Sequence, residues 1–321
     1  MVSEGDASKQ VSTDPSAAAD VYMFASDQLG VLMDAKAIGQ LGTDAEKQVK
    51  EQNGDLEVNS VTGTDGKLYG VPYTDNTWFM YYNKSKITED EAKDFDTILS
   101  KAKVAFSLQN SWYINGFYDG LSLFGEKGND ADAGMVFPKD GADITSYLVD
   151  VVANPNFSND DGASGLAAIK DGSADVLFSG TWSAKDVKEA LGDNYAATSL
   201  PTFTVNGQKK QMKSFAATKA AAYNPNAKNP KAAAQFAAYL GSTEAQKLHY
   251  EMRAIPPTDK SLSDLTTDDI AAKAQADTMA NTALLQSGLS GMNDWWTPAE
   301  TFGKALVNKE ITKDNAAAKY Q

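Results

Sequence analysis

The sequence contains five tryptophans, and each has polar or turn-forming neighbours in place of a long apolar run. They occur in the segments TDNTWF, QNSWYI, SGTWSA and MNDWWT, as Trp78, Trp112, Trp182, Trp295 and Trp296. An indole face can stack on the apolar face of a sugar ring, while nearby polar side chains bond its hydroxyls. Packing in a core is the alternative for any one ring. Taken together, the five favour a shared aromatic cleft that holds an uncharged sugar.

Carboxylates near these aromatic segments raise a second possibility, a glycoside-active enzyme. Such an enzyme places two acids on either side of the bond that it cleaves. Asp27, Asp75 and Asp294 are the candidates near aromatic residues, but no two of them stand at a fixed spacing. Because acidic surfaces are expected at this net charge, the enzyme stays an alternative, with Asp75 and Asp294 as its acids.

Several other chemistries lack the residues that they need. The chain has no Cys, and His249 and Arg253 are its only His and Arg. A thiolate metal site is therefore excluded, and a histidine-based triad or metal cluster would have to use the single imidazole of His249. His249 is expected to pack on a helix or face solvent. Few Arg also means few bidentate clamps for anionic groups, which favours an uncharged ligand.

No cofactor or metal is predicted. The aspartates between residues 130 and 161 do not form the spaced calcium loop that ends in Glu. Neither of the glycine-rich phosphate-binding fingerprints occurs.

Length and charge limit the remaining classes. The chain has 321 residues, which at about 150 residues per domain predicts two units. Its formal net charge is −14, and an acidic chain repels phosphate backbones, so no nucleic-acid partner is predicted. No run of 18 apolar residues occurs, so no membrane span is predicted.

Strands and helices must position the candidate residues, and the hydrophobic pattern predicts that they alternate. The expected strands are 21–24, 68–71, 77–82, 174–179, 195–200 and 219–223. The expected helices are 28–33, 89–102, 111–124, 144–152, 164–170, one opening at 182, 231–240, 243–253, 267–285, 297–307 and 312–320. Gly66-Lys67 and Asn206-Gly207 are turn signals. This alternation predicts an α/β fold.

The order of several segments resembles the maltose/maltodextrin-binding proteins, which are family 1 extracellular solute-binding proteins of sugar ABC importers. The segments are DVYMFASDQLGVLMDAKAI, GKLYGVPYTDNTWFMYYNKSKI, KDGSADVLFSGTWSAKD, YAATSLPTF, NPKAAAQFAAYLGSTEAQ and MNDWWTPAETFGKAL. The resemblance implies a receptor, not an enzyme, that binds a neutral oligosaccharide of the maltodextrin class and delivers it to a membrane permease. It also implies a place at the extracellular face of the membrane, held by a lipid anchor, or in the periplasm.

The resemblance further implies a two-lobe, type II periplasmic-binding-protein-like fold with a hinge and an interlobe cleft. The first lobe is expected to hold residues 1–82 and 216–262, and the second residues 83–215 and 263–321. Proteins of this family have a further strand and helix ahead of the region where this sequence starts. The first lobe is therefore expected to be incomplete at its N-terminus, and no signal sequence is visible.

Site residues carry over from the family one by one. Phe24 corresponds to a cleft aromatic residue, Asp27 to a sugar-bonding acid and Asp75 to the acid on a hinge strand. Gln28 stands where the family often has Arg. The remaining matches are Trp112 and Tyr113 for the second-lobe aromatic position, Trp182 for a stacking ring, Trp295 or Trp296 for the last cleft tryptophan, and, by adjacency, Asn76, Trp78 and Asp294.

Two other interpretations stay open besides the glycoside-active enzyme. The ligand could be a different neutral oligosaccharide, since the matching segments specify the superfamily more closely than the sugar. The protein could also serve adhesion or sensing on the same fold.

Overall fold

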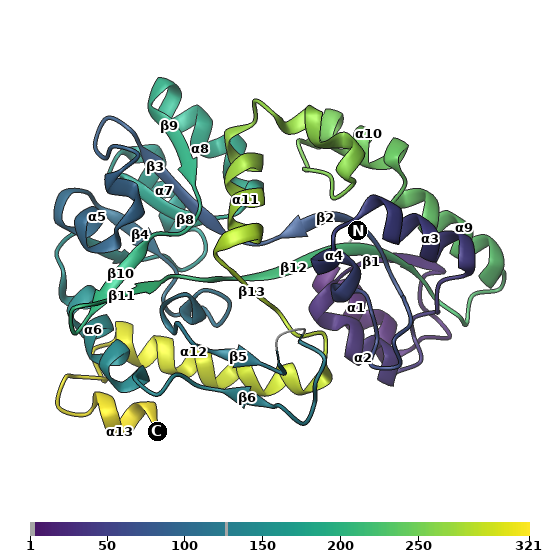
Figure 1. Ribbon diagram of the computed structural model, residues 1–321, viewed down its shortest axis with the longest axis horizontal. Helices are drawn as coiled ribbons and strands as arrows, with labels where there is room; N and C mark the ends of the chain where they lie inside the picture. The colour runs from purple at the N-terminus through teal and green to yellow at the C-terminus, as the bar shows by residue number, and fades with distance from the viewer. Residues whose placement is uncertain (1–3, 126–127) are drawn as a thin grey trace.

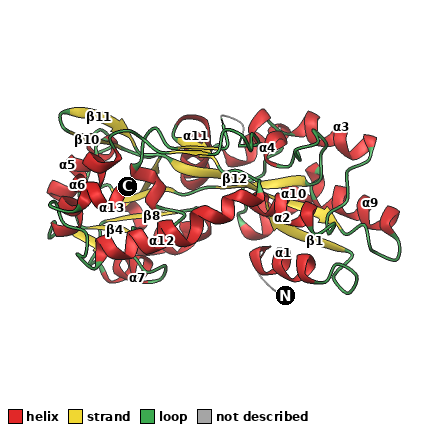
Figure 2. Ribbon diagram, turned by 90° about the horizontal axis from the view of Figure 1, so that it is seen from below, coloured by secondary structure: helices red, strands yellow, loops and turns green. Residues whose placement is uncertain are grey.

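The chain folds into two halves joined by extended strands, as the computed structural model shows for residues 4–125 and 128–321 (Figure 1). Helices α1–α4, α9 and α10 lie at one end, and α5–α8 and α13 at the other. Strand β12 runs along the middle and reaches both halves, a course that the perpendicular view repeats (Figure 2). The observed architecture is α/β, as the sequence predicts, and has two larger sheets and two two-stranded ones. The predicted residue boundaries of the lobes stay a prediction.

The first sheet is built around the long strand β12, which pairs with three partners. Its strands are β1 (Val21–Ala25), β2 (Val71–Asn76), β12 (Ser214–Tyr223) and β13 (Ala283–Leu285). β1 and β2 run antiparallel to β12, whereas β13 runs parallel to its first three residues. The β2 pairing has an irregularity between Lys219 and Ala220, opposite the segment that contains Pro72. β12 therefore brings segments far apart in the sequence into contact.

The second sheet has the order β7-β4-β8-β3-β9 and belongs to the other half. Its strands are β3 (Phe79–Asn83), β4 (Val104–Phe106), β7 (Phe157–Asn159), β8 (Val176–Ser179) and β9 (Tyr195–Thr198). Two short pairs complete the strands, β5 (Ser122–Leu123) with β6 (Met135–Val136) and β10 (Thr202–Val205) with β11 (Gln208–Gln211). The predicted turn at Asn206-Gly207 connects β10 and β11, with φ of 50° and 75° at these residues.

The helices cover the sheets of both halves. In the half that contains β1 they are α1 (Glu4–Thr13), α2 (Leu29–Asp34), α3 (Thr43–Gln52), α4 (Asp55–Ser60), α9 (Pro230–Leu240) and α10 (Thr243–Arg253). The others are α5 (Phe95–Lys101), α6 (Gly141–Ala153), α7 (Ser164–Asp171), α8 (Ala184–Leu191), α11 (Ile270–Asn281), α12 (Asn293–Val307) and α13 (Ala316–Tyr320). Short 3-10 turns include η1 (Ser26–Gln28), η2 (Glu91–Lys93), η3 (Ile114–Phe117), η4 (Thr181–Ser183) and η7 (Ser290–Met292). In this described part of the chain, no helix combines the length and apolar character that a membrane crossing requires.

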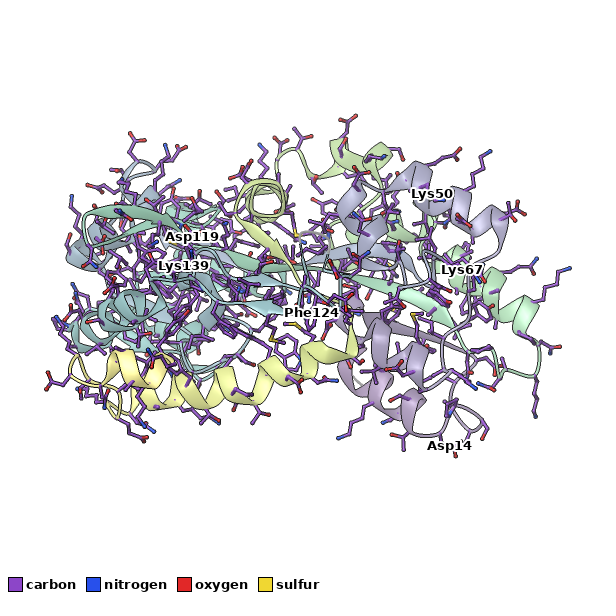
Figure 3. All side chains as sticks on the ribbon, turned by 60° about the horizontal axis from the view of Figure 1, so that its bottom comes forward. Asp14, Lys50, Lys67, Asp119, Phe124 and Lys139 are labelled. Carbon is purple, nitrogen blue, oxygen red and sulfur yellow. The ribbon has the colours of Figure 1, made fainter. Side chains whose placement is uncertain are left out.

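Each face of the five-stranded sheet has its own hydrophobic core. Along β3, Met80 and Tyr82 pack into one core and Phe79 and Tyr81 into the other, as strand alternation requires. A third core lies under β1 in the opposite half. Charged side chains project outward over both halves, while Phe124 lies near the centre of the molecule (Figure 3).

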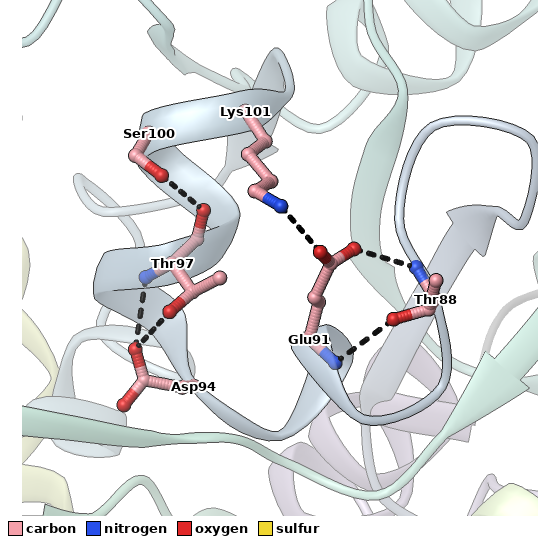
Figure 4. Close-up of polar contacts among 6 residues, drawn as sticks. All are labelled: Thr88, Glu91, Asp94, Thr97, Ser100 and Lys101. Carbon is pink, nitrogen blue, oxygen red and sulfur yellow. Dashed lines mark hydrogen bonds and ion pairs between the residues drawn. The ribbon is translucent and has the colours of Figure 1, made fainter.

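One expected helix divides in two because a side chain starts a new helix within it. Residues 89–102 form η2 and then α5, and the carboxylate of Asp94 accepts the Thr97 N–H at 2.8 Å as the cap of α5 (Figure 4). Before η2, Thr88 and Glu91 bond each other's backbone N–H groups, and Glu91 also pairs with Lys101. The Asp94 cap therefore stabilises the start of α5, the Thr88 and Glu91 bonds stabilise η2, and the Glu91–Lys101 pair ties η2 to the end of α5.

Three other expectations about local structure were wrong. Residues 111–124 do not form one helix, because η3 and β5 occupy this stretch and Gly120 has a φ of +93°. Residues 267–285 form α11 followed by β13, whose pairing with β12 takes the place of further helix. The last long helix starts at Asn293, four residues before the expected start at Thr297.

Candidate ligand-binding site

Three aromatic rings from two loops of the second half lie together. The ring of Trp112 lies 5.9 Å from that of Trp182 and 5.6 Å from that of Tyr113, measured between centroids. Trp182, on η4 directly after β8, is 51% exposed. Trp112 and Tyr113 are half-buried and precede η3. An exposed indole next to two further rings can stack on a flat, uncharged ligand.

A cavity of about 540 Å³ opens beside this aromatic cluster and is lined by Tyr113 and Trp182. Hydroxyl, amide, carboxylate and ammonium groups contribute most of its polar lining, from Ser107, Asn110, Asp160, Lys170, Ser179 and Ser183. Flat aromatic area and hydrogen-bonding side chains therefore share one hollow. This combination suits a sugar, which has apolar ring faces and a rim of hydroxyls.

Trp78, the remaining tryptophan of this region, packs against the aromatic cluster from the core. It is fully buried, and its ring stacks on Tyr113 with 5.0 Å between centroids and 24° between planes. Its indole N–H donates to the Trp112 carbonyl oxygen at 3.0 Å. Trp78 is a core residue with no exposed surface in this structure, and its contact with a ligand stays a prediction.

Gln286 orients the Trp112 ring. The indole N–H of Trp112 donates to Gln286 Oε1 at 2.8 Å, and Gln286 itself is buried directly after β13. The Gln286 backbone N–H donates to the Ala216 carbonyl oxygen of β12. The ring is thus tied to the strands that join the two halves.

Three segments that carry acidic residues meet at Thr218 of β12. Asp75 lies opposite Thr218 in the β2 register, and Asn76 follows it. The Thr218 N–H donates to the Ser26 hydroxyl at 3.0 Å, which places η1 and its Asp27 beside the strand. The hydroxyls of Thr218 and Ser60 lie 2.6 Å apart, which places the end of α4 beside β12. These contacts bring the η1, α4 and β2 segments to one point on β12.

Burial shifts the proton affinity of two of these acids. It raises the pKa of Asp27 to about 6, although the amide of Gln28 donates to Asp27 Oδ2 at 2.7 Å and opposes the shift. Burial, together with the charge and hydrogen bond of Glu57, raises the pKa of Asp75 well above its usual range. Asp75 Oδ1 has no hydrogen-bond partner within residues 4–125 and 128–321. A buried acceptor of this kind can take a hydrogen bond from a ligand hydroxyl.

Helix α11 contacts both the segment that contains Asp75 and the aromatic cluster of Trp112, Tyr113 and Trp182. The Gln275 amide on α11 donates to the Asp75 carbonyl oxygen at 2.9 Å, and α11 also contacts η4, which holds Trp182. Two residues after Asp75, the Thr77 hydroxyl donates to the Phe215 carbonyl oxygen of β12 at 2.7 Å. The ring of Phe215 in turn lies 6.0 Å from that of Trp296.

Exposure separates the adjacent tryptophans Trp295 and Trp296. Trp295 is buried, its indole N–H donates to the Ser111 carbonyl oxygen at 2.9 Å, and it packs against Phe215. Trp296 is half-buried and has surface left for a ligand. Of the two, Trp296 is therefore the candidate ligand residue, and Trp295 is a core residue.

Two further predicted site residues lie elsewhere. Phe24 is fully buried in the core under β1, because β1 alternates and turns Phe24 to the same face as Tyr22. Asp294 is exposed at the start of α12 and lines a different hollow, along α12 and α13 with Tyr118 and Tyr320. Neither residue lies with the aromatic cluster in this structure, and contact of either with a ligand stays a prediction.

The acids of this site do not form a metal centre. In the part of the chain that the structure describes, no three His, Asp or Glu side chains come close enough to hold an ion. His249 lies on α10, and its ring centroid is 5.4 Å from that of Tyr73 with 74° between the planes, consistent with helix packing.

Sequence reasoning missed three residues that shape the site, namely Glu57, Gly180 and Gln286. Glu57 and Gln286 lie in segments without aromatic neighbours, so no local pattern marks them. Gln286 reaches Trp112 across 174 positions of sequence. Gly180 stands in the SGTW segment itself, and its role is visible only from the ring that folds over it.

A two-lobed α/β architecture with an exposed indole, half-buried aromatic rings, hydroxyls and acids is typical of a solute-binding protein. The family model of bacterial extracellular solute-binding proteins matches residues 3–280. The chain belongs to this family, so it is an extracellular binding protein and not an enzyme.

Individual relatives agree with the family. A maltooligosaccharide ABC transporter solute-binding lipoprotein of Streptococcus pneumoniae is 28% identical, over 82% of this chain and 67% of that protein. A galactooligosaccharide-binding protein of Bacillus subtilis is 27% identical, over 88% of this chain and 70% of that protein. A solved structure described as being with acarbose has a TM-score of 0.94 and 44% identity, and covers 100% of this chain and 86% of that one.

Proposed function

We propose that this protein is the substrate-binding component of a sugar ABC importer and that it binds a maltooligosaccharide without altering it. The observation that carries the proposal is the half-exposed indole of Trp182, packed beside Trp112 and Tyr113 at the edge of a polar cavity. The printed functions of the Streptococcus pneumoniae relative and the acarbose complex support the same ligand class.

Two kinds of contact hold the sugar in this proposal. Trp182, Trp112, Tyr113 and Trp296 supply flat apolar area, which favours the faces of glucose rings. Asp27, Asp75 and Asn76 accept or donate hydrogen bonds at the hydroxyls. Closure of two lobes over the ligand would stabilise the complex only if the sugar contacts both groups of residues.

Delivery to a membrane permease follows from this role, and the predicted partner is the transmembrane part of an ABC importer. We also propose that a lipid anchor holds the mature protein at the outer face of the membrane, because the Streptococcus pneumoniae relatives are described as lipoproteins. Fractionation of cells that produce the full-length gene product tests the anchor. A protein found only in the medium would contradict it.

Isothermal titration calorimetry tests the ligand. Maltotriose and maltopentaose are expected to bind with a single site, whereas a galactooligosaccharide of equal length is expected to bind more weakly. Tight binding of the galactooligosaccharide and no binding of maltooligosaccharides would replace the proposed ligand with the class that the Bacillus subtilis relative binds.

A further inference from the structure

We propose that Gly180 is a positioning residue, whose missing side chain lets the Trp182 ring fold back against the backbone in the orientation that stacks on sugar. This inference rests on the proposed function. A Cβ atom added at Gly180 would lie 2.1, 2.3 and 2.6 Å from three carbons of the Trp182 ring. Such distances are far inside van der Waals contact, so the ring occupies the space that any other residue at position 180 would need.

The backbone itself does not require glycine at this position. Gly180 has a φ of −103° and a ψ of −170°, which is extended backbone open to every residue. Its carbonyl oxygen accepts the Tyr81 hydroxyl at 2.8 Å, so the peptide is fixed from the core side. The close approach of the Trp182 ring is therefore the feature that makes glycine necessary here.

The consequence for the ligand is geometric. One face of the Trp182 ring rests on Gly180, and the ring lies 5.9 Å from Trp112 with 37° between the planes. An added methyl group must push the ring outward by at least about 1 Å to restore normal contact. The ring then leaves its place beside Trp112 and no longer offers the same surface to a sugar.

Gly180→Ala, compared with Gly42→Ala, separates this role from a general effect of losing a glycine. Gly42 also has extended backbone, with a φ of −77° and a ψ of 167°, and no atom lies within 4 Å of an added Cβ. Gly180→Ala is expected to raise the Kd for maltotriose about tenfold, the size of one lost stacking contact. Gly42→Ala is expected to leave the Kd unchanged.

A double-mutant cycle with Trp182→Ala identifies the ring as the cause. In the Trp182→Ala background, Gly180→Ala has no ring to displace and is expected to change the Kd by less than about twofold. A full tenfold loss in that background, or no loss in the wild-type background, would overturn the proposal. If Gly180→Ala alone fails to fold, the double variant is expected to regain the fold, and failure of both would also overturn it.

Near-ultraviolet circular dichroism tests the ring position without any ligand. The Trp112–Trp182 pair is expected to give a signal that Gly180→Ala changes and Gly42→Ala preserves. An unchanged spectrum in Gly180→Ala would contradict the positioning role, even if sugar binds. Absence of maltooligosaccharide binding by the wild-type protein, with the expected spectral change intact, would instead contradict the proposed function alone.

Discussion

Replacing Trp182 with alanine should weaken sugar binding by about tenfold. The side chain is 51% exposed, and a fully exposed indole has roughly 250 Å² of surface, so about 125 Å² faces solvent. A sugar stacked on one face covers about half of that area. At about 25 cal/mol per Å², the lost contact amounts to about 1.5 kcal/mol, which is close to a factor of ten in Kd.

Isothermal titration calorimetry with maltotriose at neutral pH measures this effect. Phe236→Ala is the matched control, because Phe236 is 52% exposed on α9 and lies outside the aromatic cluster. The control should bind as the wild-type protein does. Since Trp182 is half in solvent, both variants should also keep the wild-type free energy of unfolding to within about 1 kcal/mol. An unchanged Kd in Trp182→Ala would refute the assignment of this ring to the ligand.

Three other predictions test the surrounding residues. Trp78→Ala should lower the free energy of unfolding by about 3–5 kcal/mol in urea titrations, because it empties a core position; a loss below about 1 kcal/mol would contradict its burial. The pKa of Asp27 is about 6 when folded and 3.8 in the unfolded reference, so the folded state holds this proton more strongly, and its stabilising contribution is lost as pH rises from about 4 to 6. Asp27→Asn has no carboxylate to titrate, so it does not undergo this loss. The difference in free energy of unfolding between Asp27→Asn and the wild-type protein should therefore rise from about pH 4 to 6, by at most about 3 kcal/mol. A difference that does not change with pH would argue against the burial of the carboxylate. Overnight incubation with maltotriose should yield no shorter sugar by chromatography, and turnover abolished in Asp75→Asn would revive the enzyme alternative.

The residues of the aromatic cluster could be predicted from the sequence because their neighbours in the chain are of one kind. Trp112, Tyr113 and Trp182 stand in polar, turn-rich segments, and the structure brings their rings within 6 Å of a neighbour. Trp78 has similar neighbours in the sequence but is fully buried. Polar flanking residues show that a loop is near, but they do not show which way a side chain points. Contact of any of these rings with sugar stays a prediction.

Other outcomes depend on packing that the sequence does not encode locally. Trp295 and Trp296 are neighbours on one helix, so they point about 100° apart and only tertiary contacts decide which one is buried. Phe24 could have been assigned to the core, since the alternation of β1 puts it on the face of Tyr22. Nothing local could have paired Trp112 with Gln286, which joins the site through the pairing of β13 with β12.

A crystal structure of the protein grown with maltotriose tests the central claim most directly. The sugar is predicted to stack on Trp182, with ring carbons within about 4.5 Å of the indole atoms, and to hydrogen-bond Asp75. A sugar bound elsewhere, such as the hollow along α12 and α13 lined by Tyr118 and Tyr320, would contradict the proposed site.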